Sequence, residues 1–293
     1  MQGWLELNDR GVLAIGGEEA KPFLQGLLSN DLDRLAPDRA LYAALLTPQG
    51  KFLFDLLLLE RDGIIWADVE AARRHELLQR LTMYRLRAKV TLRDASDTMA
   101  VLAVVPPPLP AGSLRGFAAA WGGGIVAVDP RLAELGGRAI VPRAEIAALT
   151  AGLPEAKAEA WEALRLRLGV PAAGSDLVVQ KSTLLESNFE ALDGVAFDKG
   201  CYVGQELTAR TKYRALVRKR LLPVRAAGPC PPAGTPLLAD GRDAGELRST
   251  QGERGLALVR LEVLGDGPIT AAGVTLAVEW PAWLPPEPAT AES

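Results

Sequence analysis

Short apolar runs separated by turn sequences dominate the first hundred residues of the chain. Apolar runs of roughly four to eight positions are typical of strands, whereas apolar spacings of three and four are typical of helices. The expected elements are a hairpin over 4–16, a helix over 18–28, strands over 40–46, 51–60 and 64–69, a helix over 71–82 and a strand over 88–92. Strands and helices therefore mix, and the hairpins favour an α+β fold over a doubly wound parallel sheet.

The remainder of the chain divides into further parts. The proline-rich stretch 105–112 predicts an exposed connection, either a domain linker or a long loop. An amphipathic helix is expected over 155–168, with Gly169 as its C-terminal cap. From about residue 217 short strands recur without a helix, which is typical of a small antiparallel barrel or sandwich. The predicted units are α+β regions over 1–104 and 105–216, a β-barrel over 217–284 and a disordered tail over 285–293.

The composition is that of a soluble globular protein and excludes several classes. With 48% hydrophobic residues, 24% charged residues and a net charge of −3, the chain is not a basic nucleic-acid coat protein. Its most apolar run, 52–59, is interrupted by Asp55 and is too short to cross a bilayer, so no membrane association is expected. The first residues do not resemble a signal peptide, and the expected location is therefore the cytoplasm.

Histidine and cysteine are scarce, which limits the available chemistry. Two cysteines cannot build a disulfide framework or a four-cysteine metal site. The one histidine, His75, stands in a charged helical pattern and is expected on a solvated helix face. Ser-His-Asp hydrolases, Cys-His hydrolases and multi-histidine metal sites are therefore not expected, and no metal site is predicted.

The stretch Lys199-Gly200-Cys201-Tyr202-Val203-Gly204-Gln205-Glu206 concentrates the most chemistry. Cys201 lies between two glycines and close to a lysine, a setting in which a thiol can be exposed and partly ionised. A helix is expected over 205–212, and the dipole at its start favours a thiolate nearby. The alternative is a small buried residue, since free cysteine is often buried. Cys230 stands in a proline-rich turn, and we expect it to have no functional role.

Basic residues cluster after the cysteine. Between Lys199 and Arg220 there are seven basic residues and one acid, a local net charge of +6 in a chain of net −3. Such a cluster indicates an anionic ligand or partner: a carboxylate-bearing cofactor, a phosphate or an acidic protein surface. The alternative is an ordinary charged surface. RNA binding is allowed by the charge, but no aromatic-stacking signature accompanies it, so stable direct binding of nucleic acid is not expected.

Two acidic positions are further candidates. Asp55 interrupts an apolar strand, and a buried carboxylate needs partners, so it either marks a site or faces outward on an edge strand. Glu186, in Glu186-Ser187-Asn188, could accept two hydrogen bonds from a planar amino-heterocycle such as a pterin. The alternative for Glu186 and Asn188 is a solvated loop.

The stretch from Leu184 to Leu222, centred on the eight residues around Cys201 and continuing through Leu207-Thr208-Ala209-Arg210, resembles the signature of the YgfZ family. That family includes relatives of mitochondrial iron–sulfur assembly factors and is related to the aminomethyltransferase (T-protein, GcvT) of the glycine cleavage system. Weaker likeness covers most of the chain. It includes Phe23-Leu24-Gln25-Gly26-Leu27-Leu28-Ser29-Asn30-Asp31-Leu32, Leu46-Thr47-Pro48-Gln49-Gly50-Lys51, Tyr84-Arg85-Leu86-Arg87 and Arg165-Leu166-Arg167-Leu168-Gly169-Val170-Pro171.

The resemblance implies a GcvT-like arrangement of small domains, two of them α+β and the last a β-barrel, around a central folate channel. It implies tetrahydrofolate as cofactor and a role in assembling or repairing iron–sulfur clusters in client enzymes, including those of tRNA thiolation. The implied partners are iron–sulfur assembly proteins and these clients. By position, the resemblance implies that Cys201 is the functional thiol and that Glu186 and Asn188 lie toward the pterin. The residues that it implies shape the pocket around the thiol are Lys199, Gln205 and Arg210.

Asp55 departs from the family pattern of the aminomethyltransferases. Asp55 falls near the acid that those enzymes use at folate, where they carry an Asp-Asp pair, whereas this chain has Phe54-Asp55. Folate-dependent one-carbon transfer of the aminomethyltransferase type is therefore the alternative function. A single thiolate cannot hold an iron–sulfur cluster that normally needs four ligands, so a partner or a second copy would have to supply the others.

Overall fold

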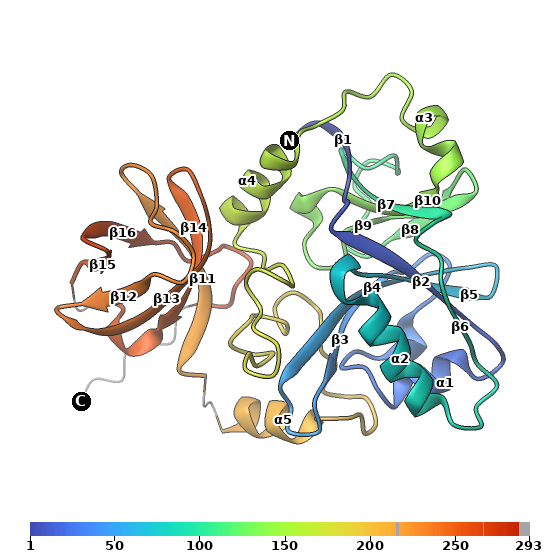
Figure 1. Cartoon of the computed structure of the whole chain (residues 1–293), viewed down its shortest axis with the longest axis horizontal. Helices are drawn as coiled ribbons and strands as arrows, with labels where there is room; N and C mark the ends of the chain where they lie inside the picture. Colours follow the sequence, from blue (N-terminus) through green and yellow to red (C-terminus); the bar gives the residue numbers. More distant parts are fainter. Residues whose placement is uncertain (215–216, 266, 287–293) are drawn as a thin grey trace.

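The computed structural model describes residues 1–214, 217–265 and 267–286, and it contains two five-stranded sheets and a closed barrel. Figure 1 shows the two sheets together on one side of the molecule and the barrel on the other. All pairings between neighbouring strands are antiparallel. The mixture of helices and antiparallel sheets confirms the predicted α+β class.

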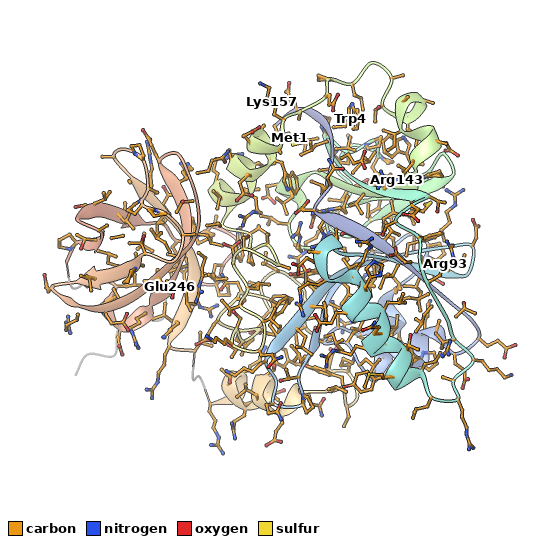
Figure 2. The ribbon with its side chains drawn as sticks, in the orientation of Figure 1. Met1, Trp4, Arg93, Arg143, Lys157 and Glu246 are labelled. Atoms are coloured by element: carbon orange, nitrogen blue, oxygen red, sulfur yellow. The ribbon has the colours of Figure 1, made fainter. Side chains whose placement is uncertain are left out.

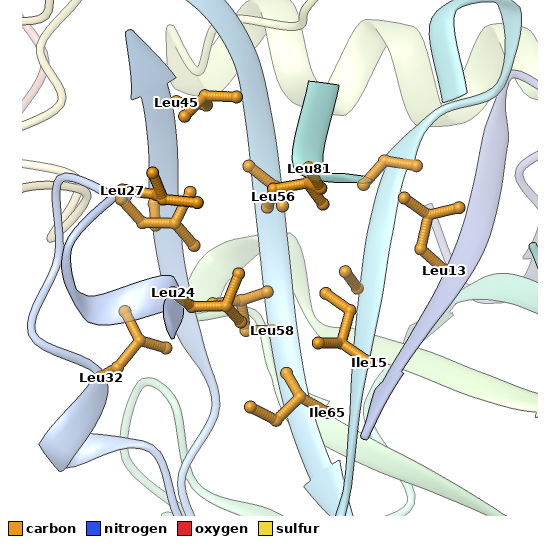
Figure 3. Close-up of a cluster of buried hydrophobic side chains, with 14 of the residues drawn as sticks. Leu13, Ile15, Leu24, Leu27, Leu32, Leu45, Leu56, Leu58, Ile65 and Leu81 are labelled. Atoms are coloured by element: carbon orange, nitrogen blue, oxygen red, sulfur yellow. The ribbon is translucent and has the colours of Figure 1, made fainter. Parts of the chain in front are cut away.

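The first sheet carries the largest core. Its strand order is β3 (Leu41–Leu46), β4 (Phe52–Arg61), β5 (Ile64–Glu70), β2 (Arg10–Gly16) and β6 (Thr91–Asp94). Helices α1 (Ala20–Gln25) and α2 (Arg74–Arg85) cover one face. Leucine and isoleucine side chains from both helices and from four of the strands meet between these layers (Figure 3). Burying them drives the packing, at about 25 cal/mol per Å² of apolar surface.

The second sheet combines the first strand of the chain with four strands that lie between residues 99 and 142. Its order is β1 (Gly3–Glu6), β7 (Met99–Val105), β10 (Gly137–Pro142), β9 (Gly124–Val128) and β8 (Ala118–Trp121). The short helix α3 (Ile146–Leu149) follows β10. Because β1 pairs with β7 while β2 pairs with β5 and β6, the hairpin predicted over 4–16 is wrong. Both runs are strands, but they enter different sheets.

Two longer helices connect the sheets to the barrel. Helix α4 (Ala158–Leu168) stands between the second sheet and the barrel in Figure 1 and ends at Gly169 in the left-handed conformation, as predicted. Irregular chain follows as far as α5 (Gln205–Tyr213), which leads to the barrel. Five single turns of 3₁₀ helix complete the described elements: Leu32–Arg34, Ala71–Arg73, Ala133–Leu135, Arg143–Glu145 and Leu261–Val263.

The barrel is closed by six antiparallel strands. In spatial order they are β11 (Lys219–Ala226), β14 (Arg254–Arg260), β13 (Arg242–Gln251), β12 (Pro236–Ala239), β15 (Ile269–Ala271) and β16 (Val274–Val278). Closure leaves no free sheet edge among them. Buried aliphatic side chains fill the interior, and the partly buried Cys230 packs against them.

A buried polar cluster fastens the barrel to α4. Arg165 on α4 donates to Asp176 Oδ2 at 2.6 Å and to Ser249 Oγ on β13 at 3.0 Å. Ser249 in turn donates to Asp176 Oδ1 at 2.6 Å. Figure 2 shows Glu246, on the same strand β13, on the barrel side that faces the rest of the molecule. The cluster therefore sets how the barrel sits against the irregular segment that contains Glu186.

The second sheet extends across the boundary predicted after residue 104. Strand β1 and nearly all residues of strand β7 fall within the predicted unit 1–104, and β8, β9 and β10 of the same sheet follow it. The stretch 105–112 is a loop between β7 and β8 of one sheet. Residues 287–293 of the predicted tail lie outside the described residues. None of the described helices is long and apolar enough to cross a membrane.

Candidate functional site

Cys201 carries an exposed free thiol on a loop whose backbone is fixed on both sides. Val203 N–H donates to the carbonyl of Gly26 at 3.2 Å, beside α1. Gly204, with φ +81°, precedes α5 and packs on the turn between β3 and β4. A Cβ at Gly204 would lie 2.3 Å from the carbonyl oxygen of Thr47, so only glycine fits there. The chain therefore presents the sulfur to solvent from a rigid support near the start of a helix.

Lys199 supplies a second anchor for this loop. Its ammonium donates to the carbonyl oxygens of Gln25, Leu28 and Asn30 at 2.8, 2.7 and 2.7 Å. An ammonium has three donors, so all of them are used inside the protein. Burial lowers the pKa of Lys199 to about 8, against the attraction of nearby aspartates. Lys199 thus holds the loop onto the end of α1, and its donors are not free for a ligand.

Gln205 and Arg210 lie in the same region of the molecule. The Oε1 atom of Gln205 accepts a hydrogen bond from Tyr202 N–H at 3.2 Å, which closes the turn after Cys201. Both side chains and Lys199 line an open hollow of about 730 Å³ along α5. The structure therefore brings together four of the residues singled out from the sequence, Cys201 by its loop and the other three as walls of the hollow.

Glu186 and Asn188 lie elsewhere, where the irregular segment meets the barrel. Glu186 lines a cleft of about 450 Å³ between residues 176–187 and barrel strands β11, β13 and β14. One of its carboxylate oxygens accepts from Thr183 Oγ1 at 2.7 Å. Asn188 is buried: it donates to the carbonyl of Leu221 at 2.7 Å and accepts from Arg220 at 2.9 Å. Asn188 therefore joins the segment to the barrel, and Glu186 faces the cleft.

Asp55 occupies a third location, deep between the two sheets. It lies on β4 between β3 and β5, so the edge-strand alternative is wrong, and it is 2% exposed. Its partners are Arg10, whose Nη1 lies 3.2 Å from Oδ1, and Tyr42, whose hydroxyl donates to Oδ2 at 3.4 Å. The adjoining cavity measures about 30 Å³, room for about one water molecule.

An ion network that the sequence reasoning missed surrounds Asp55. Arg10 also bonds Asp68, Arg138 contacts Asp68, and Arg131 pairs with Asp129. Burial opposes the charge on Arg10, but Asp55 and Asp68 outweigh it and raise the pKa of Arg10. The sequence did contain a signal for this network, namely charged residues inside apolar strands. Asp68 interrupts β5 and Arg138 interrupts β10, in the same way that Asp55 interrupts β4.

These three places are separate, and two of them, the cavity beside Asp55 and the Glu186 cleft, adjoin each other. Arg165 lines the small cavity beside Asp55, Asp176 lines the Glu186 cleft, and the two side chains bond each other. Among the described residues, no group of three or more histidine, cysteine or acidic side chains could hold a metal ion. His75 is 65% exposed on α2, as expected. Of the two cysteines, Cys201 is exposed and Cys230 is partly buried.

Known sequences that are similar to this chain include mitochondrial iron–sulfur cluster assembly factors. Residues 218–286 match the family described as "CAF17, C-terminal beta-barrel domain". The chain is 36% identical over 305 residues to the human "Iron-sulfur cluster assembly factor IBA57, mitochondrial", covering 95% of this chain and 84% of that protein. It is 33% identical over 293 residues to the mouse protein of the same name, covering 90% and 78%.

Comparison with solved structures supports the fold. The aminomethyltransferase T of the glycine cleavage system from Bartonella henselae superposes with a TM-score of 0.78 at 14% identity, covering 96% of this chain and 86% of that chain. The GcvT-like fold with a C-terminal barrel is thereby confirmed. The expected cytoplasmic location is wrong by these comparisons, because the human, mouse and Mycosarcoma maydis relatives are all named as mitochondrial.

Proposed function

The chain belongs to the IBA57 family of iron–sulfur cluster assembly factors, and from this premise we propose that it acts through the Cys201 thiolate as a tetrahydrofolate-binding protein of the YgfZ type. One observation carries the proposal: the exposed sulfur of Cys201 stands on a loop fixed by Lys199 and Gly204. A rigid loop that carries an exposed sulfur suits transfer, because the protein need not reorganise when the sulfur binds its cargo.

In this proposal, Cys201 supplies one ligand to an iron–sulfur cluster that the protein passes on as cargo. Clusters are normally held by four protein ligands, and no described group of histidine, cysteine or acidic side chains adds the rest. An assembly protein, a client enzyme or a second copy of the chain must therefore supply the other ligands. The clients that we propose include the iron–sulfur enzymes of tRNA thiolation, so any effect on tRNA would be indirect.

The Glu186 cleft is where tetrahydrofolate fits. Its volume of about 450 Å³ falls in the usual range for small-molecule sites, roughly 300–1,000 Å³. The carboxylate of Glu186 can accept hydrogen bonds from the amino group and ring N–H of a pterin. Lys181 and Lys219 line the same cleft and suit the carboxylates of the folate tail. Bound tetrahydrofolate would supply a reduced pterin ring there.

One-carbon transfer of the aminomethyltransferase type is less well supported. Its acid would be Asp55, which is already paired with Arg10 beside a cavity with room for about one water molecule. A pterin does not fit there without displacing the ion network. The alternative therefore lacks both the space and an available carboxylate.

A paired rescue and binding experiment tests the proposal. Cys201→Ala should abolish rescue of a cluster-dependent enzyme in cells that lack this protein, while Cys230→Ala should rescue fully, since Cys230 packs against the barrel core. Full rescue by Cys201→Ala would refute the role of the thiol. Titration with tetrahydrofolate should give saturable binding that Glu186→Gln weakens about tenfold or more, the loss typical of a charged hydrogen bond. Absence of binding to the unaltered chain would remove the folate half alone.

A further inference from the structure

The hollow along α5 has the shape of a docking groove. It measures about 730 Å³ and is wide open to solvent, and Arg210, Arg214 and Phe197 are among the residues that line it. A smaller, mostly apolar pit of about 40 Å³ lies in the same area and is lined by Ala196, Phe197, Tyr202, Ala209 and Tyr213, together with the polar Lys199 and Gln205. That volume accommodates about one methyl-sized group. The groove therefore combines a polar rim with a small apolar pit.

The cations on the rim of this groove are available for a partner. Arg210 and Arg214 are exposed, and neither has a hydrogen-bonded or ionic side-chain partner among residues 1–214, 217–265 and 267–286. Two neighbouring acids are already engaged, because Glu190 pairs with Lys212 and Asp198 pairs with Arg34, while Glu206 also lines the groove and pairs with neither Arg210 nor Arg214. An occupant would therefore meet two unpaired guanidinium groups, which bind carboxylates with bidentate geometry.

The aromatic residues of the groove form one ordered wall. Phe197 and Tyr213 meet edge to face with ring centroids 6.4 Å apart. The ammonium of Lys212 lies 4.0 Å from the centroid of Phe197 and covers its face. Tyr213 is 72% exposed, which is unusual for a large aromatic side chain without a partner. Tyrosine and arginine together are the residues most typical of interface anchors.

We propose that this groove is the docking site for an extended acidic segment of a partner protein. One apolar side chain of the segment enters the pit, and its flanking carboxylates pair with Arg210 and Arg214. A single-stranded nucleic acid fits less well, because Lys212 covers Phe197 and leaves Tyr213 as the one exposed ring of the groove for base stacking.

The groove lies next to the loop that carries Cys201. Tyr202, which lines the pit, directly follows Cys201, so a docked segment lies beside the loop that carries the thiol. The inference deepens the proposed function by giving the recognition chemistry of the partner, and it rests on that function for what the partner exchanges with Cys201. It does not require folate.

Site-specific photocrosslinking in cells tests the proposal. The full chain is produced with p-benzoylphenylalanine in place of Tyr213, irradiated, and the adducts are mapped by mass spectrometry. We expect one main protein adduct whose crosslinked peptide is rich in Asp and Glu around an aliphatic residue. Adding Arg210→Glu and Arg214→Glu should reduce its yield at least tenfold, as for a desolvated charge pair. Raising the ionic strength of a purified reconstitution should also weaken binding.

Matched controls separate this groove from the surface in general. Leu114 is also exposed and apolar, and the photoreactive residue at that position should not give the adduct. Arg93 on β6 is exposed and lies far from α5, and Arg93→Glu should leave the yield unchanged (Figure 2). Cys201→Ala should keep the adduct, so failure of the thiol's role and failure of docking are distinguishable. A peptide without acids, an RNA adduct, a crosslink to a second copy or no adduct at all would each overturn the proposal.

Discussion

The ammonium of Lys199 lies 2.7 Å from the carbonyl oxygen of Asn30, although the two residues are 169 positions apart in the chain. The same ammonium bonds the carbonyls of Gln25 and Leu28, which lie at and just beyond the end of α1. Helix ends leave carbonyls without partners, and a cation is favoured there. The loop of Cys201 is therefore anchored on the first sheet unit, and the position of the thiol depends on the structure of that unit.

Replacing this cation should loosen the loop. Lys199→Met keeps the aliphatic stem but leaves three carbonyls without their donor, at about 1–3 kcal/mol for each buried group that water does not reach. We expect a loss of about 2 kcal/mol in unfolding free energy and faster hydrogen exchange over 199–204. Urea denaturation and exchange mass spectrometry measure the two effects.

Lys199→Arg is the matched variant for that experiment. A planar guanidinium cannot direct three donors at carbonyls that converge on one point, so arginine should not restore the protection of the loop. Restoration by arginine would show that positive charge alone, without the three-donor geometry, positions Cys201.

The two glycines beside Cys201 should respond differently to substitution. Gly204→Ala places a Cβ 2.3 Å from the carbonyl oxygen of Thr47 at a positive φ, and the left-handed conformation alone costs about 1–2 kcal/mol. A Cβ at Gly200 meets no atom within 4 Å, so Gly200→Ala should be neutral in stability. Thermal unfolding of both variants, with the alkylation rate of Cys201, compares them. Equal destabilisation by the two substitutions would contradict the docking of Gly204 on the β3–β4 turn.

Sequence patterns predicted the elements of the fold better than their pairing. The strands over 40–46, 51–60 and 64–69 are found as β3, β4 and β5 because their apolar runs are buried in one sheet. The turn sequence within 4–16 predicted a hairpin, yet β1 pairs with β7 in one sheet and β2 pairs with β5 in the other. Pairing depends on burial against distant segments, here β7 for β1, which local pattern does not contain.

The candidate site shows the same division between local and distant information. Cys201 was singled out because glycines and a lysine stand within a few residues of it in the sequence, and its predicted exposure is seen in the structure. Lys199 was expected to shape a ligand pocket, and its bonds to α1 could not be foreseen because they join residues far apart in the chain. The partners of Asp55, above all Arg10, were missed for the same reason.

Acid should weaken the buried network through Asp129. Burial raises the pKa of this carboxyl, but the charge and hydrogen bonds of Arg131, with help from Arg138, outweigh burial and hold the pKa below its ordinary value of 3.8. A group with a lowered folded pKa contributes stability that is complete above the unfolded pKa and is lost as pH falls through the folded value. The contribution of Asp129 should therefore be intact at neutral pH and decline below about pH 4.

Asp129→Asn isolates that contribution. Because the amide leaves Arg131 and Arg138 without their countercharge, we expect about 3–5 kcal/mol of destabilisation at pH 7. The difference in unfolding free energy between the two proteins should narrow as pH falls from 5 to 2.5. Chemical denaturation at each pH checks this, and a difference that stays constant or widens on acidification would contradict the assigned charge state.

The link between α4 and the barrel should behave as one cooperative unit. Arg165→Met removes one partner of a buried ion pair with Asp176, for an expected loss of about 3–5 kcal/mol. Ser249→Ala removes hydrogen bonds to both Arg165 and Asp176, for about 1–2 kcal/mol. Because the two side chains share Asp176, the double variant should lose less than the sum of the single losses, with a coupling of about 0.5–3 kcal/mol.

Thr235→Ala, at an exposed hydroxyl elsewhere in the barrel region, provides the control and should be additive with Arg165→Met in unfolding free energy. Additivity for Ser249→Ala as well would mean that Arg165 and Ser249 stabilise the junction independently and do not form one coupled cluster with Asp176.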